Sequence, residues 1–229
     1  MIKKNDEQTR RVLVVATHPD DEVLGCGGTL ALHAARGDRI WVVIACEGES
    51  ARDEARNHTE QTERARLVLG IERVINFNFP DQKLDTLSLL SVIGPLEEVV
   101  NQLQPQVVYC HHGGDINRDH QLLFQALMVA TRPTVACIEA IYAFDTASST
   151  EWGYPRTFVP DTWVDISASL PQKLEAMACY ESEVRAYPHP RSLLALRHKA
   201  HAWGNQACMD AAEVFMTVRR LVRHDQAPL

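Results

Sequence analysis

The chain has no Cys-x-x-Cys pair, and its six cysteines are widely spaced along 229 residues. That absence argues against a zinc knot and a disulfide framework, and it favours buried, reduced thiols in a cytoplasmic protein. No apolar run approaches the length of a membrane span, and the polar, charged segment 1–11 is unlike a signal peptide. With a net charge of −7 and scattered basic residues, the chain also lacks the basic stripe typical of proteins that bind nucleic acid.

What is present is an ordinary globular composition. Hydrophobic residues make up 45% of the chain and charged residues 23%, and there is neither an internal repeat nor a linker. A length of 229 residues is enough to bury a substantial core in one α/β domain. We therefore expect a single domain over residues 1–229, with a polar N-terminal extension at 1–10 and a polar tail at 220–229.

Short apolar runs alternate with longer, helix-favouring segments along the chain. Strands are predicted at 12–16, 40–45, 74–77, 107–110, 138–144 and 162–166. Helices are predicted at 24–36, 53–69, 89–104, 120–130 and 169–184, with a mainly helical C-terminal third after that. Ser169 and Gln172 resemble a capping box at the start of the fifth of these helices. The alternation predicts an α/β fold, namely a Rossmann-like, doubly wound, mostly parallel sheet with helices on both faces.

Two polar loops follow the first and fourth predicted strands, where sheets of this kind bind their ligands. The first reads Thr17-His18-Pro19-Asp20-Asp21-Glu22, so three carboxylates stand in consecutive positions. Such crowding is unfavourable unless a cation is present or protons are taken up. The second loop, residues 111–121, adds histidines, aspartates and two glycines. Imidazole and carboxylate groups together suit zinc, and three protein ligands with one water make a catalytic site.

Other interpretations of these loops stay open at this point. Paired acids before a helix often serve as partners of the helix dipole. His111 and His112 could be hydrogen-bonded residues at the end of a strand rather than ligands. A Rossmann oxidoreductase is disfavoured, because Leu30 stands where the third glycine of a dinucleotide fingerprint belongs. The conjunction of both loops at one edge of one sheet favours the metal site.

At these residues the sequence resembles the PIG-L/LmbE family of zinc-dependent N-acetylglucosaminyl deacetylases. That family has an Ala-His-Pro-Asp-Asp-Glu motif after its first strand, and here the motif is 17–22 with Thr in place of Ala. A second family motif ends in Asp-His, as 115–120 does. The resemblance continues through Gly25-Cys26-Gly27-Gly28, Leu69-Gly70-Ile71, Phe79-Pro80-Asp81, His189-Pro190-Arg191-Ser192 and Ala212-Glu213-Val214-Phe215.

The resemblance implies a role for each matching residue. It implies His18, Asp21 and His120 as the zinc ligands. It also implies that Asp20 is the general base, and Asp119, next to a ligand, is expected to orient it. Iron(II), cobalt(II) and manganese(II) fit the same ligand types.

The sequence departs from the family pattern in two places. Some members have a histidine that stabilises the oxyanion three residues before the last ligand, and here that position is Asn117. Asn117 can donate a hydrogen bond, and His111 or His112 could take the same part. Many members have an arginine and a glutamate where this chain has His58 and Gln61.

The expected function is hydrolysis of an N-acetylated amino sugar or its conjugate to acetate and a free amine. His112, His189 and Arg191 are candidate substrate-binding residues. Expected partners are therefore a small-molecule or glycoconjugate substrate, and a homo-oligomer is compatible with the sequence. Two alternatives remain at this stage: a zinc hydrolase of another amide or an ester, and a metal-dependent sugar-binding module without turnover.

Overall fold

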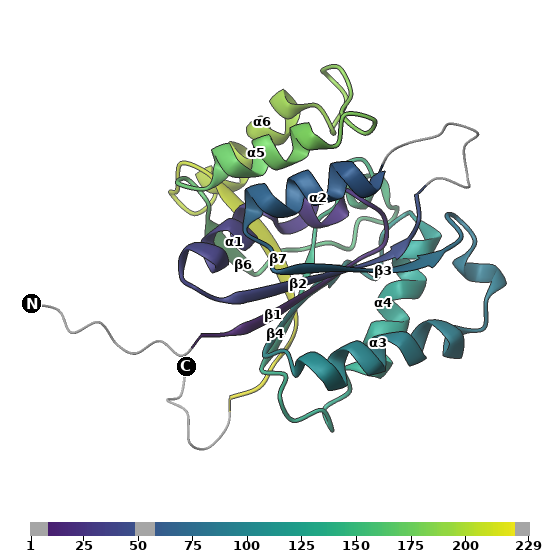
Figure 1. Ribbon diagram of the computed structural model, residues 1–229. Coiled ribbons are helices and arrows are strands. Elements are labelled where there is room, and N and C mark those ends of the chain that lie inside the picture. The colour runs from purple at the N-terminus through teal and green to yellow at the C-terminus, as the bar shows by residue number, and fades with distance from the viewer. Residues whose placement is uncertain (1–8, 49–57, 223–229) are drawn as a thin grey trace, which may run out of the picture.

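The computed structural model describes residues 9–48 and 58–222 (Figure 1). The strands in these residues form one seven-stranded sheet in the order β3-β2-β1-β4-β5-β7-β6. β1 to β5 are parallel, and β7 is antiparallel to both of its neighbours. The strands are β1 (Arg11–Ala16), β2 (Arg39–Cys46), β3 (Arg73–Phe79), β4 (Val107–His111), β5 (Ala140–Phe144), β6 (Thr162–Asp165) and β7 (Ala212–Arg220).

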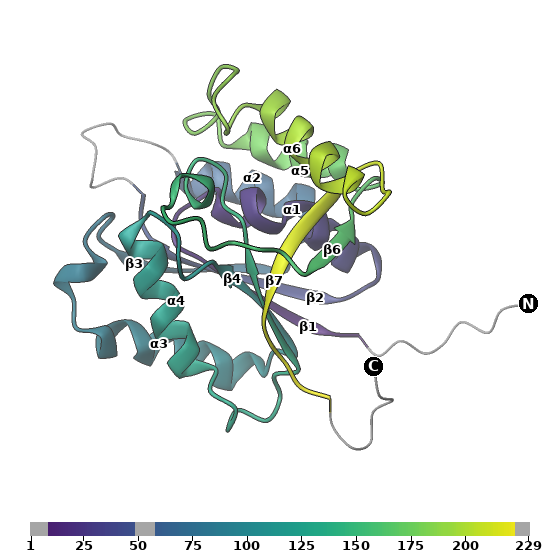
Figure 2. The same cartoon turned by 180° about the vertical axis from the view of Figure 1, so that it is seen from behind.

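Helices cover both faces of this sheet (Figures 1 and 2). One face carries α1 (Asp21–Ala35), α2 (His58–Leu69), α5 (Leu170–Cys179) and α6 (Leu193–Asn205), and the other carries α3 (Leu89–Leu103) and α4 (Arg118–Ala130). Two short 3-10 turns, η1 (Leu84–Thr86) and η2 (Thr150–Trp152), lie in loops. The predicted fold class, a Rossmann-like sheet with helices on both faces, is confirmed.

The apolar runs of the sequence form strands whose side chains pack into hydrophobic cores on both faces of the sheet. In β1, Val12 and Val14 pack into the core beneath α1, whereas Leu13 and Val15 pack into the core beneath α3 and α4. Alternate residues point to opposite faces of a strand, so a strand covered on both sides must be apolar throughout.

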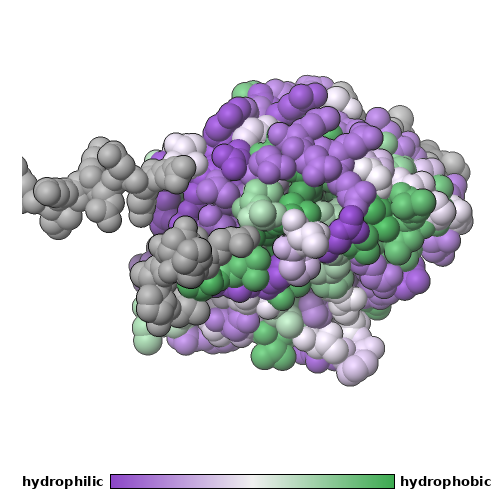
Figure 3. All heavy atoms as spheres, turned by 90° about the horizontal axis from the view of Figure 1, so that it is seen from below, coloured by the Kyte–Doolittle hydropathy of each residue, from purple (hydrophilic) through white to green (hydrophobic). Residues whose placement is uncertain are grey.

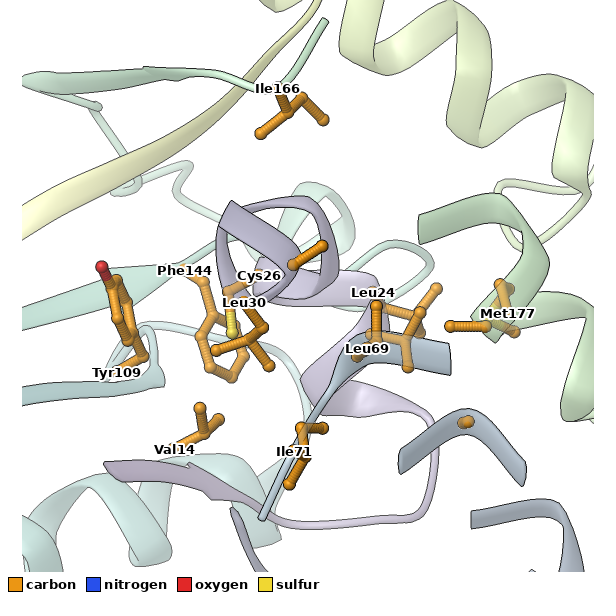
Figure 4. Packing of buried hydrophobic residues seen from close by; sticks show 14 of the residues in the cluster. Val14, Leu24, Cys26, Leu30, Leu69, Ile71, Tyr109, Phe144, Ile166 and Met177 are labelled. Carbon is orange, nitrogen blue, oxygen red and sulfur yellow. The ribbon is translucent and has the colours of Figure 1, made fainter. Parts of the chain in front are cut away.

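Glycines allow α1 to lie close to the sheet. A Cβ atom at Gly25 would collide with the Phe144 ring, and one at Gly28 would collide with Ile166. Figure 4 shows Cys26 and Leu30 of α1 close to Phe144 in this core. The glycine-rich run therefore serves helix–sheet packing, and it brings the first turn of α1 to the end of β1.

Three predictions for the C-terminal part were wrong. Residues 212–220 form β7, an antiparallel strand, although the region was expected to be mainly helical. α5 ends at Cys179 rather than at 184, because the chain turns there. Ser169 makes no capping bond to α5, since its hydroxyl donates to the Gly28 carbonyl oxygen at 2.8 Å.

Parts of three predicted segments lie outside the described residues. They are positions 53–57 of the second predicted helix, positions 1–8 of the N-terminal extension and positions 223–229 of the tail. Within the described ranges, no helix combines the length and apolarity needed to cross a bilayer. The face seen in Figure 3 is largely hydrophilic, with hydrophobic side chains gathered in separate patches.

Candidate metal and active site

The two loops singled out in the sequence meet at one edge of the sheet. β1 and β4 are adjacent and parallel, so the segment after Ala16 and the segment after His111 leave the sheet side by side. The first segment leads into α1 at Asp21, and the second leads into α4 at Arg118. A cavity opens between them, and His18, Asp20, Asp21, Asn117, His120 and Arg191 are among its lining residues.

Three donor atoms of the predicted ligands form a nearly equilateral triangle. His18 Nδ1 lies 3.2 Å from His120 Nε2 and 3.3 Å from Asp21 Oδ2, and His120 Nε2 lies 3.4 Å from Asp21 Oδ2. Two ligands of a tetrahedral zinc ion, each about 2.0–2.1 Å from the metal, stand roughly 3.3 Å apart. The donor set and its spacing therefore fit one tetrahedral divalent cation.

Neighbouring groups orient the triangle. The peptide N–H of His18 donates to Asp21 Oδ2 at 2.8 Å, and His18 Nε2 lies 2.9 Å from Asp81 Oδ1. A proton on Nε2 facing Asp81 leaves the lone pair of Nδ1 for a cation. On the other side, His120 Nδ1 lies 3.3 Å from Asp115 Oδ1. Asp81 belongs to the Phe79-Pro80-Asp81 segment that resembles the family, but the sequence predicted no role for it.

The acidic and basic groups around the triangle shift one another's pKa values. Burial would raise the pKa of Asp21, but His120 and His111 hold it well below its ordinary value. Burial would lower the pKa of His18, but Asp21 and Asp81 raise it to about 10. The two carboxylates thus favour positive charge at this place, which is also what a cation would supply.

Asp20 occupies a strained position beside the triangle. Its backbone has φ 108° and ψ −26°, a left-handed conformation that residues other than glycine rarely adopt. The Asp20 N–H donates to Glu22 Oε2 at 3.2 Å, and the phenolic hydroxyl of Tyr180 donates to Glu22 Oε1 at 2.6 Å. Burial and the neighbouring Asp21 raise the pKa of Asp20 well above its ordinary value.

Asn117 caps α4 at the cavity wall. Its Oδ1 accepts from the N–H of Asp119 at 2.9 Å and from the N–H of His120 at 3.4 Å. Because the oxygen is engaged in the helix cap, the amide has its Nδ2 group left as a hydrogen-bond donor.

The structure separates the two histidines at the end of β4. His111 is buried beneath His120, with the ring centroids 3.8 Å apart, and its Nε2 accepts from the Thr17 N–H at 3.0 Å. His112 points elsewhere, because its Nε2 lies 2.8 Å from Thr157 Oγ1 and it lines a different surface pocket. Neither histidine lines the cavity of the metal ligands.

Asp119 lies behind the triangle rather than in the cavity. Its Oδ1 accepts from the Leu84 N–H at 3.2 Å, and its Oδ2 accepts from Cys46 Sγ at 3.7 Å. His18, Cys46 and Asp119 form a second group of donor atoms within 4.8 Å of one another, so His18 is shared by two candidate ligand sets.

Arg191 reaches the cavity from the C-terminal part of the chain. One of its terminal nitrogens lies 2.8 Å from Glu183 Oε2 and 3.4 Å from Asp20 Oδ2. His189 lies outside the cavity lining, and its Nδ1 accepts from the Arg191 N–H at 3.1 Å. His58, one of the two departures from the family pattern, is buried in the cavity wall 3.4 Å from Glu183 Oε1.

Known proteins resemble this chain in sequence. The uncharacterized deacetylase YaiS of Escherichia coli is 34% identical over 152 residues, which cover 64% of this chain and 80% of the relative. The diacetylchitobiose deacetylase of Thermococcus kodakarensis is 24% identical over 189 residues, with 76% of this chain and 70% of the relative covered.

Solved structures share the fold. The conserved protein TT1542 of Thermus thermophilus matches with a TM-score of 0.76 and 26% identity, over 96% of this chain and all of that one. A 4-carboxy-2-hydroxymuconate hydratase of Pseudomonas putida matches with a TM-score of 0.75 and 24% identity, over 96% and 100% of the two chains. At that identity the second likeness concerns the fold alone, and it shows that the fold by itself does not decide the reaction.

A family model assigns the chain more specifically. The model of the PIG-L family, described as GlcNAc-PI de-N-acetylase, matches residues 13–131. This segment is just over half of the chain, and it contains both loops that form the triangle of donor atoms. The protein therefore belongs to the PIG-L family of deacetylases.

Proposed function

We propose that this protein is a metal-dependent N-deacetylase that hydrolyses the acetamido group of an amino sugar to acetate and a free amine. The observation that carries the proposal is the triangle of donor atoms from His18, Asp21 and His120, with edges of 3.2–3.4 Å, in the same cavity as Asp20. Family membership agrees with this reaction.

Zinc is our first candidate for the metal, because two imidazole nitrogens and one carboxylate oxygen are typical of catalytic zinc sites. Iron(II), cobalt(II) and manganese(II) suit the same donors. When bound, the ion would supply Lewis acidity, which polarises the acetamide carbonyl and makes a water molecule easier to deprotonate.

Asp20 is proposed as the group that moves the proton. It takes a proton from the attacking water as the new carbon–oxygen bond forms, and it gives that proton to the amine nitrogen as the carbon–nitrogen bond breaks. A carboxyl group whose pKa is raised by burial is a stronger base than an exposed carboxylate, so it suits the step that accepts the proton, and the same group can then release it to the amine. Arg191, 3.4 Å away, opposes part of that rise and keeps the carboxylate form available.

Asn117 is proposed as the donor to the oxygen that becomes negatively charged. Its Nδ2 group belongs to a side chain held by the helix cap, so the donor is fixed before the substrate arrives. Asp119 is proposed to act indirectly, by supporting the loop of Leu84 and the back of the metal site.

The substrate class is proposed from the relatives and from the cavity wall. The Thermococcus relative is named for an N-acetylated disaccharide, so an N-acetylglucosamine unit alone or in a conjugate is the first class to test. His58, Glu183 and Arg191 supply polar groups that can hold sugar hydroxyls. His189 positions the Arg191 backbone, and His112 is removed from this wall by its place in another pocket.

Asp20→Asn tests the proposal. It should retain the metal, measured by elemental analysis, and lose turnover of N-acetylglucosamine and diacetylchitobiose by on the order of 100-fold or more, measured as released primary amine. The control is Asp85→Asn, which neutralises an exposed aspartate of η1. Unchanged turnover in Asp20→Asn would remove Asp20 from the mechanism.

A wider screen separates the alternative functions. Turnover of other amides or esters, with none of N-acetylated sugars, would indicate a different hydrolase. Sugar binding without amine release would indicate a binding module. We also propose a single-domain organisation and a cytoplasmic location; the six free cysteines suit a reducing compartment.

A further inference from the structure

A second pocket of about 380 Å³ opens at the opposite edge of the sheet from the metal ligands. It lies between the C-terminal half of α1 and the strands β4 to β7, and we call it the edge pocket. Its walls include Arg10, His33, Arg36, Tyr109, Tyr142 and Arg220. β1 starts beside Arg10 and ends just before the metal-binding loop, so its 6 residues place the two sites roughly 20 Å apart.

The edge pocket exists because no crossover helix covers this part of the sheet. The connection from β5 to β6 contains only the short turn η2 within described residues 145–161. The floor is aromatic: half-buried Tyr142 stacks on the largely buried ring of Tyr109, with centroids 5.7 Å apart, and Phe215 supports Tyr109 from within the core at 5.1 Å. In Figure 4, Tyr109 stands at the border of the labelled core residues. This floor suits a flat ring.

Three exposed arginines stand at the rim. Within residues 9–48 and 58–222, the side chains of Arg10, Arg36 and Arg220 make no hydrogen bond or ion pair. Arginines at the same sheet edge but outside the pocket are engaged: Arg39 pairs with Glu72 at 2.6 Å, and Arg11 Nε donates to a backbone carbonyl at 2.8 Å. The rim is therefore locally basic on a chain of net charge −7.

The interior of the pocket contains a Tyr109–His33 pair and a single carboxylate. The Tyr109 hydroxyl oxygen lies 3.0 Å from His33 Nε2, and His33 Nδ1 lies 2.7 Å from Asp38 Oδ2. Burial lowers the pKa of His33 despite the opposing effect of Asp38, and the lower pKa favours the neutral form of the ring. Glu139 is the one carboxylate among the lining residues.

We propose that the edge pocket binds a small organic anion with a flat aromatic ring. The ring lies on Tyr142 beside Tyr109, and its phosphate, carboxylate or sulfonate group is held by the guanidinium groups at the rim. Arginine forks match the oxygens of such anions, and the volume lies within the range of small-molecule sites. This site is independent of the proposed deacetylase reaction.

The first experiment uses 1-anilinonaphthalene-8-sulfonate, an aromatic sulfonate whose fluorescence rises on binding, with the full-length chain. We expect saturable binding, weakened roughly tenfold or more in the Arg36→Gln/Arg220→Gln double variant. Both positions are exposed, so the fold should persist, and circular dichroism checks this. The matched control is Arg73→Gln, an exposed arginine at the start of β3 outside the pocket, which should bind as the natural chain does.

Displacement distinguishes the anions. Adenosine monophosphate tests the phosphate and 4-aminobenzoate tests the carboxylate, and displacement of the dye by either supports the proposal and ranks the two groups. Equal dye affinity in the double variant and the natural chain would overturn it. So would a dye that neither compound displaces, because the binding would then not be that of an aromatic anion site.

Discussion

The backbone of Asp20 adopts a conformation that costs stability in any residue other than glycine. A left-handed φ of 108° suits glycine, yet a carboxylate stands there, beside two further acids. Such conformations cost about 1–3 kcal/mol and persist where the surroundings hold them. Here the Glu22 carboxylate accepts the Asp20 N–H and is itself held by Tyr180.

A pair of substitutions separates strain from chemistry. Asp20→Gly and Asp20→Ala both remove the carboxylate, so both should lose deacetylation. Only glycine also relieves the backbone, and Asp20→Gly should therefore exceed Asp20→Ala by about 1 kcal/mol in the free energy of unfolding. Urea denaturation measures the difference, and equal values for the two variants would mean that this conformation is not strained.

At the scale of single elements, Asn117 both caps α4, which stabilises the helix, and supplies the proposed oxyanion donor. Asn117 uses its oxygen for the cap, so Asn117→Asp should keep the cap, and Asn117→Ala should lose it at a cost of about 1 kcal/mol. Both variants lack the Nδ2 donor and should lose turnover by about 100-fold. Metal content and unfolding are measured alongside turnover. An Asn117→Asp variant with full metal and natural turnover would exclude the amide as an oxyanion donor.

His33, near the C-terminal end of α1, should make the free energy of unfolding depend on pH. The pKa of His33 lies below its ordinary value of 6.5, so the unfolded chain takes up this proton before the folded chain does. The free energy of unfolding should therefore fall as the pH drops below about 6.5. His33→Gln removes the titrating ring, so its stability should decline less steeply between about pH 7 and about pH 5. Denaturation curves at several pH values test this, and parallel declines would contradict it.

The strands that could be predicted from sequence were those whose hydrophobic pattern matches their burial in the fold. β1, β2 and β4 are buried on both faces, and each reads as a continuous apolar run. β7 escaped prediction because Glu213 interrupts its apolar residues, and that carboxylate is satisfied only in the fold, by Lys173 Nζ at 2.5 Å and by the Gly28 N–H at 2.9 Å. A partner 40 positions away leaves no local signal.

The same limit applies to the site. The strand pattern placed the two loops at one edge of the sheet, the family resemblance picked out His18, Asp21 and His120 within them, and the structure brings these three donor atoms together. Their supports come from elsewhere in the chain: Asp81 follows β3, and Arg191 lies 171 positions from Asp20. Such contacts depend on the paths of loops that are far apart in the sequence. Hydrophobic periodicity predicts helices and strands but not those paths.

At the scale of the whole molecule, a bound cation would tie together two segments that lie 102 positions apart, at His18 and His120. Because the unfolded chain does not assemble this site, binding should stabilise the fold. Zinc at about 100 times its dissociation constant should add about 2.7 kcal/mol to the free energy of unfolding. For a chain of this length, that corresponds to a rise in melting temperature of roughly 5–10 °C.

Three variants locate the ion that produces this shift. His120→Ala should abolish the shift, and His198→Ala, which removes an exposed histidine of α6, should keep it. Cys46→Ser tests the second set of donor atoms, which contains Cys46 but neither Asp21 nor His120. If the ion binds at the triangle, Cys46→Ser keeps the shift. If Cys46→Ser loses the shift and His120→Ala retains it, the ion lies at the His18–Cys46–Asp119 group. An ion there would not bind the attacking water beside Asp20, and the proposed mechanism would fail.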